Sequence, residues 1–152
     1  MYEKLINCSG KRHERLIYFR RCDKIRCDMT NEKIYDLGID IGSTTAKVVL
    51  TDGESVLYER YERHNSAVRE KTVAMLGDLL KEKGDITVKA ALSGSAALGL
   101  ASEAGVAFVQ EVYAEGEVVK YKEKGVNCVI ELGGEDAKMI FIDKNGGLDE
   151  RM

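Results

Sequence analysis

The chain has 152 residues and lacks any apolar run close to the ~20 residues that a membrane-spanning helix needs. Residues 1–20 also lack the apolar stretch of a secretory signal, so the sequence predicts a cytoplasmic protein without a membrane partner. These absences do not reflect a shortage of apolar residues, because 44% of the chain is hydrophobic. That content is enough for a domain with a real core.

Cysteine and histidine are few, and their spacing does not form a strong metal signature. Cys22 and Cys27 are separated by four residues in a basic N-terminal segment, and the weaker alternative of an independent metal site there stays open. Cys128 stands in an apolar stretch, where a free cysteine usually packs as a small hydrophobe. His13 and His64 have no partner at ligand spacing, and we expect both to be solvated loop residues.

Positive charge is concentrated in a short N-terminal leader. Residues 1–33 carry nine Lys and Arg against five Asp and Glu, whereas residues 34–152 carry fourteen against twenty-one. The acidic body argues against nucleic acid as a partner. A nucleic-acid or membrane role for the leader is the weaker alternative, since its acids are interspersed. We expect a poorly ordered leader over 1–33 and a folded lobe over 34–152, with Met29 as a possible natural start.

The most informative motif runs from Leu37 to Lys47. An apolar strand carries one carboxylate, Asp40, and then enters a small hydroxyl-rich turn made of Gly42, Ser43, Thr44 and Thr45. A glycine turn lets backbone N–H groups approach an anion, and an adjacent carboxylate can hold Mg²⁺ against the same phosphate. The turn joins strand to strand, so it is neither a P-loop nor a Rossmann glycine loop, both of which open a helix. A plain β-hairpin with a polar turn is the alternative.

A second motif repeats this arrangement about ninety residues later. A strand carrying Glu131 is followed by paired glycines, two acids and a lysine, which are Gly133, Gly134, Glu135, Asp136 and Lys138. Two strand–turn–strand units with matching carboxylates suggest two loops that hold one nucleotide phosphate chain from opposite sides. We expect side chains at Gly42, Gly133 or Gly134 to block the approach of N–H groups to phosphate.

Between the two motifs, strands and helices alternate. Apolar spacing and turn signals predict strands over 46–51, 55–63, 88–92 and 106–109, and helices capped at Asn65 or Ser66 and running to Lys83, over 96–104 and over 111–124. Gly84 and Gly105 are expected to end the first two helices. This order favours an α/β fold of the ribonuclease-H-like type, a mixed sheet with flanking helices.

The motifs resemble those of the acetate and sugar kinase, heat-shock protein and actin superfamily. The match is closest to the CoA-substrate-specific enzyme activases, the ATP-dependent activators of 2-hydroxyacyl-CoA dehydratases, which are related to the ATPase subunits of benzoyl-CoA reductase. It covers about residues 34–152 and rests on four segments: 38–47, Ser93-Gly94-Ser95-Ala96, 108–111 and 130–138. The fourth segment is the most specific to the activases.

This resemblance implies an N-terminal actin-like ATPase lobe whose second lobe is missing. It implies Mg·ATP as ligand, a homodimer with a [4Fe–4S] cluster whose ligands lie outside this chain, and an acyl-CoA dehydratase or reductase as partner. ATP hydrolysis would drive a low-potential electron into that partner, although we expect this half-module to be inactive alone. A small-molecule kinase and a non-catalytic actin-like scaffold are the alternatives.

The resemblance also suggests roles for individual residues. Asp40 is expected to bind Mg²⁺ and to be catalytic together with Glu135 and Asp136. Lys47 and Lys138 follow the two turns at similar offsets, and they either bind phosphate or simply face water as strand lysines.

Overall fold

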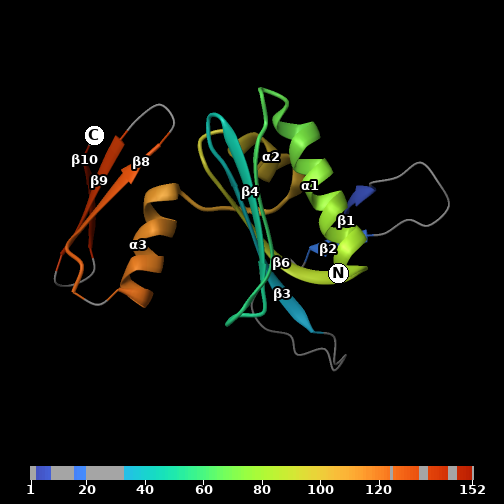
Figure 1. Cartoon of the computed structure of the whole chain (residues 1–152), viewed down its shortest axis with the longest axis horizontal. Helices are drawn as coiled ribbons and strands as arrows, with labels where there is room; N and C mark the ends of the chain where they lie inside the picture. Colours follow the sequence, from blue (N-terminus) through green and yellow to red (C-terminus); the bar gives the residue numbers. More distant parts are fainter. Residues whose placement is uncertain are drawn as a thin grey trace.

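The computed structural model describes residues 3–7, 16–19, 33–123, 125–133, 137–143 and 147–151. Its strands form two sheets, and the larger one has seven strands in the order β1-β2-β6-β3-β4-β5, with β7 also paired to β6 (Figure 1). The strands of this sheet are β1 (Glu3–Asn7), β2 (Leu16–Phe19), β3 (Ile34–Ile41), β4 (Thr45–Thr51), β5 (Val56–Arg63), β6 (Ile86–Ser93) and β7 (Ala107–Phe108).

The large sheet is mixed, as the sequence predicts. β3, β4 and β5 form an antiparallel meander, and β6 runs parallel to β3. The other edge of β6 pairs with β2 along its first half and with β7 near its end, both in parallel. The strands β1 and β2 come from the leader and were not predicted. The expected lack of order in the rest of the leader concerns residues outside the described ranges.

Buried and more exposed side chains alternate along β3 and β4, so the large sheet has a core face and a second face. The buried side chains are Leu37, Ile39 and Ile41 on β3 and Ala46, Val48 and Leu50 on β4. They pack with Met75, Leu76, Leu79 and Leu80 of α1 (Val68–Lys83) in one cluster. Because side chains alternate across a strand, Asp40 and Lys47 lie on the face opposite this core.

The C-terminal ends of the first two helices agree with the prediction, whereas the third helix ends two residues earlier than expected. Gly84 with φ +76° follows α1, and Gly105 with φ +63° follows α2 (Leu98–Ala104). The prediction that Asn65 or Ser66 caps α1 is wrong. Both have positive φ values of 48° and 66°, and they form a tight left-handed turn two residues before the helix.

The remaining elements form a second body. The helix α3 (Glu111–Lys122) packs on a small antiparallel sheet of order β10-β9-β8, built from β8 (Cys128–Leu132), β9 (Ala137–Ile142) and β10 (Leu148–Arg151). In Figure 1 this body stands on the side of the large sheet away from α1. The face of the large sheet that carries Asp40 and Lys47 is therefore the one turned toward α3.

Candidate functional site

The two charged residues of the first motif form one ion pair. Asp40 is directly opposite Lys47 in the β3–β4 ladder, and Lys47 Nζ donates a hydrogen bond of 2.9 Å to Asp40 Oδ2. This hydrogen bond raises the pKa of Lys47, so the ammonium stays charged. Asp40 Oδ1 is buried and has no hydrogen-bond partner among the described residues. The carboxylate thus keeps one oxygen for another ligand.

A backbone hydrogen bond closes the turn that follows Asp40. Gly42 N donates to Thr45 O at 2.9 Å and closes the turn. Within the described part of the chain, the backbone N–H groups of Ser43 and Thr44 have no acceptor. Two unpaired amides beside two hydroxyls are the donor set of an anion site.

Gly42 itself has no structural reason to lack a side chain. A Cβ built there would meet only Thr45 O, at 3.9 Å, which is an ordinary contact. A ligand above the turn would supply a reason, so the expectation that a side chain at Gly42 blocks phosphate stays a prediction.

His64 is part of this turn, and the expectation that it is a solvated loop residue is wrong. Its side chain and backbone are buried, with 4% of the residue exposed. Its Nε2 lies 3.1 Å from Gly42 O, and its backbone N–H donates to Thr44 O at 3.1 Å. The two residues are 22 positions apart in sequence, so no local pattern announces the contact.

Gly94 directly follows β6 and lies against the end of β3. Its motif, 93–96, is one of the four segments that carry the family resemblance. Gly94 comes after Ser93, which is paired with Asp40 across the parallel β3–β6 ladder. A Cβ on Gly94 would lie 2.3 Å from Ile41 O and 2.7 Å from Asp40 Oδ1, and its φ is +97°. Only glycine therefore lets this turn pass so close to the end of β3.

Lys138 of the second motif lies in the other body, between two acids. Its Nζ is 2.9 Å from Glu111 Oε2 of α3 and 3.6 Å from Glu131 Oε2 of β8, and only 15% of its side chain is exposed. Gly133 directly follows β8. The predicted residues Gly134, Glu135 and Asp136 lie outside the described ranges, so their placement stays a prediction.

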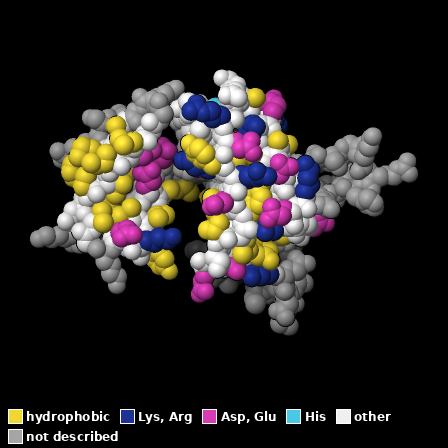
Figure 2. Space-filling view, in the orientation of Figure 1, with side chains coloured by type: hydrophobic (Ala, Val, Ile, Leu, Met, Phe, Trp, Pro, Cys, Tyr) yellow, Lys and Arg dark blue, Asp and Glu magenta, His cyan; other side chains and the backbone are white. Residues whose placement is uncertain are grey.

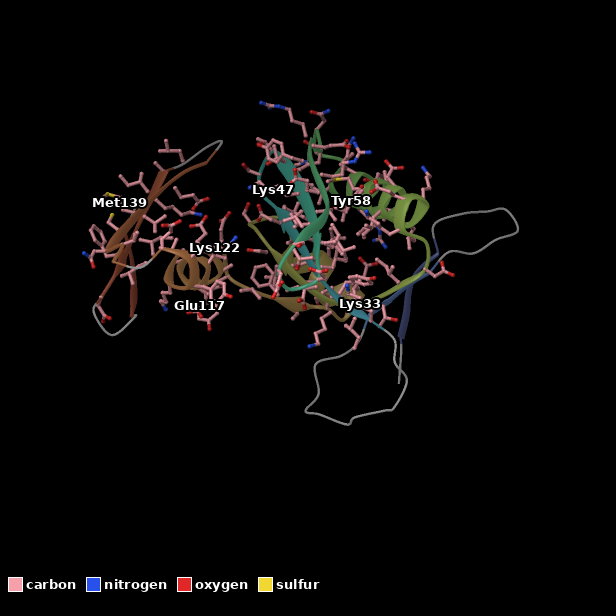
Figure 3. All side chains as sticks on the ribbon, turned by 60° about the horizontal axis from the view of Figure 1, so that its bottom comes forward. Lys33, Lys47, Tyr58, Glu117, Lys122 and Met139 are labelled. Carbon is pink, nitrogen blue, oxygen red and sulfur yellow. The ribbon has the colours of Figure 1, made fainter. Side chains whose placement is uncertain are left out.

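Electrostatics link the two bodies across the site. The charge of Glu111 contributes to the raised pKa of Lys47, and the charge of Asp40 contributes to that of Glu115 on α3. Figure 2 shows a hollow between the bodies, with acidic and basic side chains facing each other across its upper part. Figure 3 shows Lys47 on the side of the large sheet that faces α3.

Glu115 on α3 is an acid with a strongly perturbed pKa. Burial raises its pKa to about 7, and repulsion from Glu131, Glu111 and Asp40 adds to the shift, while Lys138 opposes it. Its Oε2 is buried without a hydrogen-bond partner in the described segments. The sequence predicts the helix over 111–124 but not this environment, because helix periodicity alone does not reveal which strand ends face a helix.

The raised pKa of Glu115 makes stability depend on pH. Between pH 4.5 and about 7 the unfolded chain has released this proton and the folded chain still holds it, so rising pH destabilises the fold. At pH values above 7, Glu115→Gln should therefore have a higher melting temperature than wild type. Below pH 4.5 the two melting temperatures should be equal.

Glu117→Gln on the exposed side of α3 removes the same charge and serves as the control. The measurement is a thermal melt at half-unit intervals from pH 4 to pH 8.5. A constant difference between Glu115→Gln and wild type over this range would contradict the assignment.

The described residues contain no group of three or more His, Cys, Asp and Glu placed to hold a metal ion. Cys128 is the one cysteine whose surroundings the structure describes, and it is half-buried in β8. Cys8, Cys22 and Cys27 lie outside the described ranges. None of the helices in the described part is both long and apolar enough to cross a membrane.

The mixed sheet with flanking helices is the ribonuclease-H-like lobe of the actin-like ATPase fold, as predicted. Among solved structures, the activator of the 2-hydroxyisocaproyl-CoA dehydratase from Clostridium difficile with bound ADPNP superposes with a TM-score of 0.62 at 25% identity. The likeness covers 77% of this chain and 44% of that one. Component A of the (R)-2-hydroxyglutaryl-CoA dehydratase from Acidaminococcus fermentans gives a TM-score of 0.61 at 23% identity, over 76% and 45%.

The predicted resemblance to the dehydratase activators is thereby confirmed. An uncharacterized protein of Methanocaldococcus jannaschii is also similar, at 34% identity over 111 residues, which are 72% of this chain and 44% of that protein. No family model matches the chain. The chain spans somewhat less than half the length of these relatives.

Proposed function

We propose that this chain is the ATP-binding half-module of an activase. The whole protein would couple ATP hydrolysis to low-potential electron transfer into an enzyme of the 2-hydroxyacyl-CoA dehydratase or benzoyl-CoA reductase type. One observation carries the proposal: the unpaired amides of Ser43 and Thr44 stand beside the Asp40–Lys47 pair, on a lobe similar to that of an activator with bound ADPNP.

The turn and the lysines would bind the phosphate chain. The amides and hydroxyls of Ser43 and Thr44 supply neutral donors, and Lys47 supplies a compact positive charge 2.9 Å from Asp40. Lys138 and the glycines at 133 and 134 would approach the same phosphates from the other body. Glu135 and Asp136 are proposed to act with Asp40 in hydrolysis.

Mg²⁺ fits the end of β3. It usually keeps several waters and is bound by one or two carboxylates together with substrate phosphates. Asp40 offers this single carboxylate, and its buried Oδ1 lacks a partner among the described residues. When bound, the ion would neutralise phosphate charge close to Asp40. The iron–sulfur cluster of the proposed activase finds no ligand set in the described residues, so no step is assigned to it here.

Nucleotide charge would also set the relation between the two bodies. Lys47 belongs to the large sheet, whereas Lys138 belongs to β9 of the small sheet, where it pairs with Glu131 of β8 and Glu111 of α3. A polyphosphate between them would attract both lysines, and loss of its terminal group would weaken that attraction. This change is a physical route from hydrolysis to movement, which the partner enzyme would sense.

The first test is nuclear magnetic resonance titration of the purified chain with Mg·ADPNP. We expect the amide signals of Ser43 and Thr44 to shift with nucleotide concentration, and inorganic phosphate to give a weaker response at the same signals. If these amides do not respond while the chain is folded, the nucleotide site is not at this turn.

Lys47→Ala should weaken Mg·ADPNP binding by about tenfold and flatten the salt dependence of the affinity, because one charge near the phosphates is lost. Lys33→Ala is the matched control. Lys33 pairs with Asp52 at 3.3 Å and lies at the opposite end of β3 (Figure 3). Affinity and salt dependence that stay unchanged in Lys47→Ala would identify Lys47 as an ordinary solvated strand lysine.

A further inference from the structure

His64 makes three hydrogen-bonded contacts, two with the turn over residues 42–45, which is the phosphate turn, and one with Ser66. Its backbone N–H donates to Thr44 O at 3.1 Å, its Nε2 lies 3.1 Å from Gly42 O, and the backbone N–H of Ser66 donates to its Nδ1 at 3.2 Å. The residue is 4% exposed and follows directly after β5. One buried residue thus binds two carbonyl groups of the same short turn.

These contacts define the tautomer of the ring. Nδ1 accepts a hydrogen bond from Ser66 N–H, so it carries no hydrogen. The single ring hydrogen of the neutral imidazole is therefore on Nε2, and it is donated to Gly42 O. The positive φ values of Asn65 and Ser66 form the tight turn that brings Ser66 N–H back to the ring.

Holding a carbonyl also orients the amide that shares its peptide plane. In a trans peptide the C=O and the next N–H point in opposite directions. With Gly42 O directed at His64, the N–H of Ser43 points away from the histidine, and it has no acceptor in the described part of the chain. Rotation of this peptide would instead present a carbonyl oxygen to an approaching anion and repel it.

We propose that His64 is a positioning residue of the phosphate turn: its Nε2–H fixes the Gly42–Ser43 peptide so that Ser43 N–H is aimed at a bound nucleotide phosphate. This inference rests on the proposed function and deepens it. It assigns the affinity of the turn to a side chain that does not touch the ligand.

The experiment compares three substitutions at His64 in the full chain. Gln places an amide donor where Nε2 stands, Asn is too short to reach Gly42 O, and Leu fills the volume without a donor. Thr72→Val is the matched control, because Thr72 is 6% exposed and its hydroxyl donates to Val68 O at 2.8 Å within α1, away from the turn. It removes one buried hydrogen bond as well.

We expect the Kd of Mg·ADPNP to rise about tenfold in His64→Leu and His64→Asn. In His64→Gln it should stay within about threefold of wild type, because glutamine keeps a neutral hydrogen-bond donor to Gly42 O. The Ser43 amide shift on titration should shrink in Leu and Asn and persist in Gln and Thr72→Val. If Leu does not fold, the Gln and Asn pair decides the matter.

Three results would overturn the inference. Wild-type affinity in both His64→Leu and His64→Asn would show that the hydrogen bond from His64 to Gly42 O does not affect binding. A His64→Gln variant that binds as weakly as His64→Asn would show that the lost donor is not the cause. A Thr72→Val variant with the same loss would reduce the effect to general stability. In all three the wild-type chain still binds, so the proposed function stands. A wild-type chain whose Ser43 amide ignores Mg·ADPNP overturns the proposed function and this inference together.

Discussion

Gly94→Ala should lower the free energy of unfolding by about 3–5 kcal/mol, because overpacking and a disallowed backbone conformation act at one position. The added Cβ would stand 2.3 Å from Ile41 O and 2.5 Å from Ile41 C, which are backbone atoms at the end of the central strand β3. Ala96 N also donates to Ile41 O at 3.0 Å, so the turn cannot move aside without losing this bond. A φ of +97° adds strain that alanine does not tolerate.

Gly99→Ala is the control for this change. It lies five residues later in α2, and a Cβ there would meet nothing within 4 Å. Alanine is a better helix former than glycine, and Gly99 lies in the first turn of α2, so this variant should be at least as stable as wild type. Urea unfolding of both variants gives the comparison. Equal midpoints for the two would mean that β6 and β3 do not approach as closely as described.

Asp40→Asn should have a large effect of the opposite kind, on binding rather than on folding. Loss of the carboxylate should weaken Mg·ADPNP binding by about 30- to 100-fold, the equivalent of about 2–3 kcal/mol for a contact to a charged group. The fold should change little, because the Lys47–Asp40 pair is partly exposed, with side-chain exposures of 48% and 28%. Calorimetric titration and a thermal melt on the same sample separate the two quantities.

Asp52→Asn is the charge-matched control for Asp40→Asn. Asp52 also pairs with a lysine, and hydrogen bonds from Ser55 N and Lys33 lower its pKa, but it stands in the β4–β5 turn. Its loss should leave nucleotide affinity unchanged. If Asp40→Asn instead lowers the melting temperature sharply while the folded fraction binds nucleotide as before, Asp40 is structural and not a magnesium ligand.

Much of the architecture could be predicted because it is local. The strand–turn–strand order around Asp40 follows from the apolar strands and the glycine turn, and Gly84 and Gly105 mark the ends of α1 and α2 as predicted. The glycine turn between β3 and β4 was recognised as strand-to-strand from its flanking sequence. Each of these features depends on residues a few positions apart, and such local features are predicted well from hydrophobic periodicity and turn residues.

The features that were missed depend on contacts between distant segments. His64 binds Gly42 O across 22 residues, and a buried histidine looks the same in sequence as a solvated one. Glu115 is perturbed by Glu131 and Asp40, which lie on two different sheets. The tight left-handed turn at Asn65 and Ser66 resembled a helix cap, because Asn and Ser favour both conformations. The strand β2 pairs with the edge of β6, and β1 pairs with β2, so both depend on a strand about 70 residues away in the sequence.

The exact opposition of Asp40 and Lys47 in the β3–β4 ladder also limits how this gene can change in length. One residue inserted between Gly42 and Thr44 would slip the pairing by one position. Lys47 would then turn into the core, and Ala46, Val48 and Leu50 would face the other body. Substitutions in the turn alter its chemistry gradually, whereas a single-codon insertion or deletion would exchange the two faces of the strand at once. Among descendants of this gene, the length of the turn should therefore stay constant.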